Sequence, residues 1–344
     1  MRTLLLPLTL TALAACAQYN GPESVEYDAA NDRYLVSNTG DGTIKQRDLA
    51  GTVSAFANVS PAPYGLEIQG DTVYACSGGG IKGYLLSSGV QVFALSLGGT
   101  FLNGLTSDGD LLYATDFSAG SIYRVDPAAG TFTTWVAATG GTPNGIVYDP
   151  ALDRLVVAFW GGNAPVKTYD RATAAPGPSI NTGLTNIDGI AIDCMGRFLL
   201  SSWSPDRISA LDPSLSSAPV DLGIAGMNNP ADIDFDAVHQ AVCVPNAGND
   251  AVIIASVPGC ATGMADPDAG YQDLQVIPNP ADGMVRIGVA ITEAVPFLLL
   301  DARGLLIGGG TLPRSGLLDL SHLLPGSYII DLPALRRRAR FVKD

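Results

Sequence analysis

Oxygen-bearing side chains recur at one position of a short sequence motif, here called the phrase, that the chain repeats six times. In each phrase this residue stands directly before the residue that opens an alternating, strand-like run. In chain order the six residues are Glu23, Tyr64, Asn103, Asn144, Asp188 and Ala231. Two carboxylates and two amide oxygens are hard donors of the kind that Ca²⁺ takes, at about 2.3–2.6 Å. If the six positions meet, they predict a site for one Ca²⁺.

The spacing of the phrases predicts that they do meet. The residues that follow the six donor positions are Ser24, Gly65, Gly104, Gly145, Gly189 and Asp232, at intervals of 41, 39, 41, 44 and 43 residues. A period of about 40 residues is typical of a propeller blade. Each phrase leads through a short turn to a second strand-like run. Residues 20–258 therefore predict an all-β fold, a six-bladed β-propeller of four-stranded blades, because closure of the ring protects the sheet edges.

The second strands should add side chains to the same mouth of the channel. In an antiparallel blade the innermost strand begins at the face where the second strand ends. The residues at these ends are Asn38, Ser77, Asp116, Trp160, Trp203 and Asn246. Tryptophans beside amides and carboxylates suit a partly apolar pocket for a small molecule, to which Tyr64 would also belong. The alternative is that the tryptophans plug the rim of the channel.

The donor positions also carry a family resemblance. Glu in the first blade, Asn in the third and fourth and Asp in the fifth is similar to the calcium set of the regucalcin/gluconolactonase group and of paraoxonases. These are six-bladed propellers with a metal in the central channel. The closest local matches are 143–145 and 188–189. The resemblance implies that Glu23, Asn144 and Asp188 are calcium ligands, and that Asn103 is a ligand or a substrate contact.

Two departures from the family pattern bear on catalysis. Val25 follows Ser24 where the family usually has proline, and the only histidines are His239, in a turn of the last blade, and His322, near the C-terminus. A histidine base is therefore not expected in the channel. Bound Ca²⁺ could act as a Lewis acid on a lactone or ester carbonyl, with Asp188 activating or positioning a water.

Other interpretations of the repeated phrase stay open. The chain could be a non-catalytic, NHL-like propeller that binds a ligand or a surface partner, or a scaffold whose mouth is plugged. Asn-Gly and Asp-Gly are also ordinary turn dipeptides, so Asn103, Asn144 and Asp188 could serve only to begin strands.

Residues 1–17 have the layout of a secretory signal peptide, with one positive charge, an apolar run and small residues at its end. Two cleavage sites are readable. Ala15-Cys16-Ala17 fits an A-x-A site that leaves Gln18 first, and 13–16 resembles a lipobox that leaves an acylated Cys16. We expect an exported protein that is secreted or attached to the cell surface or outer membrane.

The C-terminal part predicts a second module. Residues 259–273 are small and polar and are typical of a linker. Residues 274–344 resemble the C-terminal sorting domain of Bacteroidota type IX secretion cargo, which implies a small Ig-like β-sandwich and the type IX machinery as a partner. The matching elements are 278–280, Gly283, Asp301, Gly304, 318–321, Gly326, Tyr328 and the basic end 340–343. The alternative is a β-sandwich with a structural role.

Charge and cysteines complete the predictions. The 344 residues have a net charge of −14, which argues against nucleic acid as a partner. No apolar run reaches the roughly 18 residues of a membrane-spanning helix. We expect a monomer.

Removal of the leader leaves four cysteines in an oxidising compartment, so one or two disulfides are expected. Cys243 and Cys260, in or just after the last blade, are the first pair predicted.

Overall fold

The computed structural model describes residues 18–260, 272–289, 294–301, 306–332, 335 and 337–343. The chain forms two compact units, Met1–Thr262 and Gly263–Asp344. The predicted leader, with both cleavage sites, lies outside the described residues, as does most of the predicted linker. Each unit is treated by itself.

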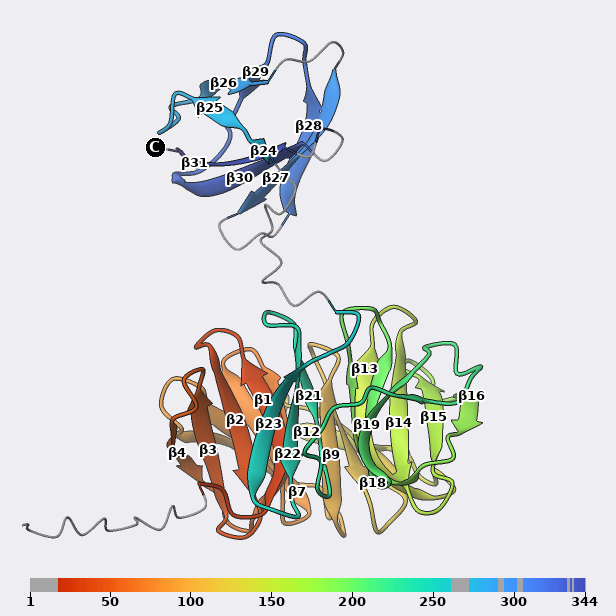
Figure 1. Ribbon diagram of the computed structural model, residues 1–344. Helices are drawn as coiled ribbons and strands as arrows, with labels where there is room; N and C mark the ends of the chain where they lie inside the picture. The colour runs from red at the N-terminus through yellow and green to blue at the C-terminus, as the bar shows by residue number, and fades with distance from the viewer. Residues whose placement is uncertain are drawn as a thin grey trace, which may run out of the picture. The chain divides into compact units, whose positions relative to one another are not determined.

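Residues 18–260 form six antiparallel sheets, each built from strands that follow one another in the sequence (Figure 1). Blades 1 to 3 contain β1 (Pro22–Asp28), β2 (Arg33–Asn38), β3 (Thr43–Asp48) and β4 (Val53–Asn58); β5 (Pro63–Gln69), β6 (Thr72–Ser77), β7 (Gly80–Leu85) and β8 (Gln91–Ser96); and β9 (Leu102–Ser107), β10 (Leu112–Asp116), β11 (Ser121–Asp126) and β12 (Thr131–Val136). Blades 4 and 5 contain β13 (Thr142–Asp149), β14 (Arg154–Trp160), β15 (Pro165–Asp170) and β16 (Pro176–Asn181), then β17 (Thr185–Ile192), β18 (Phe198–Ser204), β19 (Asp206–Leu211) and β20 (Val220–Asp221). Blade 6 contains β21 (Asp234–Asp236), β22 (Ala241–Asn246) and β23 (Ala251–Ser256).

The repeated sheets are the blades of a β-propeller, as the period predicts. The first strands of blades 1 to 6 contact one another in turn, and β1 closes the ring against β21 and β22. Second strands such as β10 are buried throughout, whereas outer strands such as β12 are mostly exposed. The one difference from the prediction is blade 6, which has three strands among the described residues instead of four.

Each inner strand of blades 1 to 5 has an irregularity at the donor position. The pairing register shifts between residues 22 and 25, 63 and 66, 102 and 105, 143 and 146, and 187 and 190. A β-bulge of this kind re-aims side chains and is common beside functional sites. The bulge therefore sets the direction of each donor side chain.

Glycine follows the donor residue in four blades because neighbouring inner strands touch there. A Cβ on Gly65 would lie 2.1 Å from the carbonyl oxygen of Asn103, and one on Gly104 would lie 2.3 Å from that of Asn144. These glycines lie inside strands and have no positive φ, so they are not turn residues. We call this level the waist; it consists of Ser24, Gly65, Gly104, Gly145, Gly189 and Asp232.

Polar contacts close the ring between blade 1 and blade 6. Ser24 Oγ donates to Asp232 Oδ2 at 2.9 Å, and the Tyr34 hydroxyl donates to Asp236 Oδ2 at 2.8 Å. Aspartates of the last blade thus accept hydrogen bonds from donors of the first. These contacts hold the ring without exchange of a strand between the two blades.

The disulfide differs from the predicted pair. Cys260 is bonded to Cys194, in the turn between β17 and β18, with 5.7 Å between their Cα atoms. Cys243 is a buried free thiol, because its side chain packs into the core between blades 6 and 1. Arg197 donates to the carbonyl oxygen of Pro258 at 2.8 Å, so the segment before Cys260 lies against the blade 5 turn. The predicted Cys243–Cys260 bond is therefore wrong.

The second unit contains two sheets around one apolar core. The first sheet has the order β24 (Gln272–Asp273), β31 (Arg337–Lys343), β30 (Gly326–Leu332), β27 (Val295–Asp301) and β28 (Leu306–Leu312). The second contains β25 (Gln275–Ile277), β26 (Met284–Gly288) and β29 (Leu317–Asp319). Val285, Phe297 and Phe341 lie in the shared core. Across all described residues, no helix has the length and apolarity to cross a membrane.

Candidate functional site

Four of the predicted donors converge at one end of the propeller channel. The side chain of Asn103, in blade 3, lies close enough to the carboxylate of Glu23, in blade 1, to oppose the rise in its pKa. Asn144 Nδ2 donates to Asp188 Oδ1 at 3.0 Å. Blades 1 and 3 are not neighbours, so a contact between them can form only across the channel. We call the set of Glu23, Asn103, Asn144 and Asp188 the mouth.

The environment of the mouth disfavours the ionised form of both of its carboxyl groups. Burial raises the pKa of Glu23 to about 7, against the opposing effect of Asn103. Burial, followed by the charges of Glu23 and Asp232, raises the pKa of Asp188 well above its ordinary value. No lysine or arginine among the described residues acts on either group. A divalent cation would supply the missing positive charge.

The mouth fits a hard cation in its donor chemistry. Its side chains offer two carboxylates and two amide oxygens, with Asn103, Asn144 and Asp188 exposed by only 4%, 1% and 3%. Asn144 Nδ2 donates to Asp188, so Asn144 Oδ1 is the amide atom that could bind a cation. Ala231 is wholly buried and offers no side-chain donor.

Three second-strand ends are anchors of loops and not pocket residues. Asn38, Asp116 and Asn246 are each fully buried. Asn38 Oδ1 accepts from the Asn20 amide at 3.0 Å, and Asn246 Oδ1 accepts from the Asn228 amide at 2.8 Å. Asp116 accepts from the amides of residues 100, 101 and 119. Each side chain therefore fixes the backbone that enters its blade, and the predicted pocket role does not fit their burial.

The predicted aromatic residues have another environment. Tyr64, Trp160 and Trp203 are all partly exposed. The charge of Glu23 contributes to a raised pKa of Tyr64, and Trp203 opposes the rise in the pKa of Asp188. These two side chains thus interact electrostatically with the two carboxylates of the mouth.

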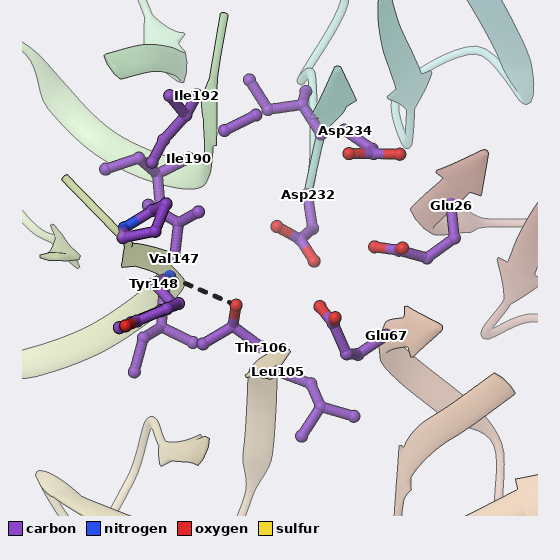
Figure 2. A pocket seen from close by; sticks show the side chains of 14 residues that line it. Glu26, Glu67, Leu105, Thr106, Val147, Tyr148, Ile190, Ile192, Asp232 and Asp234 are labelled. Carbon is purple, nitrogen blue, oxygen red and sulfur yellow. Dashed lines mark hydrogen bonds between the residues drawn. The ribbon is translucent and has the colours of Figure 1, made fainter. Parts of the chain in front are cut away.

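A cavity lies on the other side of the waist from the mouth. It has a volume of about 270 Å³ and is lined by residues of all six inner strands. Figure 2 shows the carboxylates of Glu26, Glu67, Asp232 and Asp234 turned toward one space, with aliphatic side chains opposite. We call this cavity the far chamber.

The far chamber concentrates negative charge. Burial raises the pKa of Glu26 well above its ordinary value, and Asp234, Glu67 and Asp232 raise it further. Burial raises the pKa of Asp232 to about 8, with opposition from the Ser24 hydroxyl. Buried carboxylates that act on one another titrate as a group.

Sequence reasoning missed the far chamber although the repeat contains a signal for it. Its members stand two residues after the waist position, as Glu26, Glu67 and Asp234 do. In a regular strand a residue three places beyond a donor would point to the opposite side. The bulge inserts an extra residue, so both positions face the channel.

One further group of metal-ligand residue types is found among the described residues. It consists of Asp193, Cys194 and Cys260. Since the two sulfurs are bonded to each other, the group offers no thiolate. It is a structural feature of the disulfide.

Comparison with solved structures shows the fold. A gluconolactonase from Xanthomonas campestris gives a TM-score of 0.59 at 16% identity, over 70% of this chain and 88% of that one. A putative gluconolactonase gives 0.55 at 17%, over 71% and 90%. A catalytically inactive virginiamycin B lyase from Staphylococcus aureus, with quinupristin, gives 0.51 at 16%, over 66% and 78%. No family model and no curated protein matches the chain.

Proposed function

We propose that the mouth binds one Ca²⁺ and that the site hydrolyses a lactone or an ester. Glu23, Asn144 and Asp188 would hold the ion, and Asn103 would be a fourth ligand or a contact of the substrate. The observation that carries the proposal is the meeting of two carboxylates and two amides from four blades, with no described lysine or arginine acting on either carboxylate. The likeness of the fold to gluconolactonases agrees with it.

The residues of the mouth would have different roles in such a reaction. When bound, Ca²⁺ supplies Lewis-acid stabilisation of negative charge on a carbonyl oxygen. Asp188 would orient a water and accept its proton as the water oxygen attacks the carbonyl carbon. The proton would then pass to the leaving oxygen as the ester C–O bond breaks. Asn144 keeps the Asp188 carboxylate in place through its 3.0 Å hydrogen bond.

Calcium binding and turnover test the proposal together. The dialysed protein should bind one Ca²⁺ in calorimetry and hydrolyse members of a panel of lactones and aryl esters. Asp188→Asn should lose both properties, with turnover lower by about 100-fold or more. Glu67→Gln removes a carboxylate from the same channel on the other side of the waist and should keep both. Failure to bind Ca²⁺ at millimolar concentration would contradict the metal site.

A non-catalytic, NHL-like binding propeller is the second candidate. The position of the histidines favours it, since His239 lies in the turn after β21 with its Nδ1 2.7 Å from Asp236 Oδ2. The other histidine, His322, belongs to the second unit. Bound Ca²⁺ without turnover of any panel member would select this candidate over the hydrolase.

We propose further that residues 1–17 direct export and that 274–344 form an Ig-like sandwich read by the type IX secretion machinery. The compact core of the second unit supports this interpretation. In a Bacteroidota host with that machinery, the full chain should reach the medium or the cell surface. A chain truncated after residue 273 should stay in the periplasm, and equal secretion of both chains would contradict the proposal.

A further inference from the structure

The β-bulges of blades 1, 3 and 5 each face a buried hydroxyl. In these blades the donor residue and the waist residue after it lie opposite a single residue of the second strand. That residue is Ser37, Thr115 or Ser201, and all three are fully buried. A bulge disrupts the strand ladder, and buried backbone groups need hydrogen-bond partners. A hydroxyl is suited to this place because it can both accept and donate.

Thr115 joins two blades at the mouth. Its Oγ1 accepts from the amide of Gly104, directly after Asn103, at 2.9 Å and donates to the carbonyl oxygen of Asn144 at 2.7 Å. One hydroxyl on β10 therefore contacts the backbone beside Asn103 in blade 3 and the backbone of Asn144 itself in blade 4.

Ser201 has the same role in blade 5. Its Oγ accepts from the amide of Gly189, the residue after Asp188, at 2.7 Å. It donates to the carbonyl oxygen of Ala231, in the first strand position of blade 6, at 2.7 Å. The bulge that carries the Asp188 carboxylate is thus tied to the next blade.

Ser37 bonds the bulge that carries Glu23. Its Oγ accepts from the amide of Ser24, the residue after Glu23, at 2.9 Å. Ser24 Oγ in turn accepts from the amide of Leu66 in blade 2 at 3.1 Å and donates to Asp232 in blade 6. This bulge is therefore linked to both neighbouring blades.

The hydroxyls follow the mouth residues and not the bulges as such. In blades 2 and 4 the residue opposite the bulge is Cys76 or Ala158, neither of which has a hydroxyl. The bulge of blade 2 carries Tyr64, which is not a mouth residue. Asn144, the mouth residue of blade 4, is bonded from blade 3 instead. All four mouth residues therefore have a hydroxyl bonded to their own backbone or to that of the next residue.

We propose that Ser37, Thr115 and Ser201 are positioning residues of the mouth, which fix its four side chains at the spacing that one Ca²⁺ requires. This inference rests on the proposed calcium site. The oxygen ligands of Ca²⁺ lie at about 2.3–2.6 Å from the ion. A hydroxyl that ties one bulge to the next limits the distance between the side chains they carry. Its loss lowers the affinity for Ca²⁺ although every ligand is still present.

Thr115 offers the sharpest test because its side chain can be changed in two ways. Thr115→Val removes the hydroxyl with little change in volume, and Thr115→Ser keeps it. In calorimetry the Kd for Ca²⁺ should rise by about tenfold or more in Thr115→Val and by less than about threefold in Thr115→Ser. Ser201→Ala, which removes only an oxygen, should raise the Kd in the same direction and provides a second test if Thr115→Val does not fold.

Thr168→Val is the matched control. Thr168 is a threonine on β15, the third strand of blade 4, and is exposed by only 1%. Its hydroxyl donates to the carbonyl oxygen of Pro178 on the outer strand at 2.7 Å. Loss of this buried hydrogen bond should lower the Tm, as in Thr115→Val, but leave the Kd for Ca²⁺ unchanged. An equal Kd in Thr115→Val and Thr168→Val would overturn the positioning role.

Calcium-free protein separates this inference from the proposed function. The side-chain amide NMR signals of Asn103 and Asn144 should move in Thr115→Val and stay in place in Thr168→Val. If the wild type binds no Ca²⁺ but this pattern holds, the calcium site fails and the positioning of the mouth side chains stands. If the wild type binds Ca²⁺ and neither signal moves, the positioning role fails and the calcium site stands.

Discussion

The mouth and the far chamber both contain carboxylates, but the side chains beside those carboxylates differ. At the mouth each carboxylate has an amide beside it, Asn103 at Glu23 and Asn144 at Asp188. In the far chamber Glu26 faces three other carboxylates, and each raises its pKa. The same repeat therefore builds an alternating set of donors on one side of the waist and a cluster of like charges on the other.

The comparison teaches which neutralising agent suits each side. An amide beside a carboxylate lowers the free-energy cost of ionising it and adds an oxygen donor. The mouth is therefore suited to a cation. Carboxylates without such partners reduce their repulsion by keeping protons. The far chamber is thus suited to protonation, and its acidity alone assigns it no ligand.

The largest expected effect comes from a change at the waist itself. Gly65→Ala places a Cβ 2.1 Å from the backbone oxygen of Asn103, so one of the two strands must move. We expect a loss of about 3 kcal/mol or more in the free energy of unfolding, measured by urea denaturation. Gly162→Ala, where nothing lies within 4 Å, is the control. Similar stability of the two variants would show that the waist does not hold the inner strands together.

Calcium should distinguish the two sides of the waist. At free Ca²⁺ 100 times its Kd, binding adds about 2.7 kcal/mol to the free energy of unfolding. The Tm of the wild type should rise by roughly 5–10 °C. Asp188→Asn should abolish the rise and Glu67→Gln should preserve it. The reverse result would move the ion from the mouth to the far chamber.

The far chamber should make stability fall as pH rises. The pKa of Glu67 is raised by burial and by Asp234 and Asp232, so the folded protein keeps a proton that the unfolded chain has lost above about pH 4. The folded state therefore loses stability from that pH up to the raised pKa. In calcium-free protein, Glu67→Gln should raise the Tm at pH 8 by roughly 2–4 °C and change it less at pH 5.

A surface variant provides the control for this pH effect. Asp110 is exposed, and Asp110→Asn should leave the Tm unchanged at both pH values. An equal gain from Glu67→Gln at pH 5 and pH 8 would show that the gain comes from packing and not from charge.

The repeat predicted the ring of blades and the meeting of Glu23, Asn103, Asn144 and Asp188, because one register fixes both. It could not predict the bulge, which depends on how closely neighbouring strands approach, and the far chamber was missed for that reason. The Cys194–Cys260 bond was missed because it joins a turn of blade 5 to the end of blade 6. The period says nothing about how close those two loops lie.

The second-strand ends mark a further limit of pattern reasoning. Strand position placed Asn38, Asp116, Trp160, Trp203 and Asn246 at one rim. It could not show that the polar members turn inward to bond backbone amides while the aromatic ones keep surface exposed. That difference follows from the need to satisfy buried backbone N–H groups in the loops between blades.

The smallest expected effect tests the amide compensation at the mouth directly. Asn103→Ala removes the amide that opposes the rise in the pKa of Glu23, which is about 7 with the amide present. One hydrogen bond to a carboxylate corresponds to a shift of about half a unit to one unit. In calcium-free protein, carboxylate infrared or NMR titration should therefore place the pKa of Glu23 higher in this variant. Asn144→Ala removes the amide at Asp188 instead, so it should shift the Asp188 titration and move Glu23 less. An unchanged pKa of Glu23 in Asn103→Ala would mean that the amide does not compensate the charge of this carboxylate. The two sides of the waist would then differ only in their number of carboxylates.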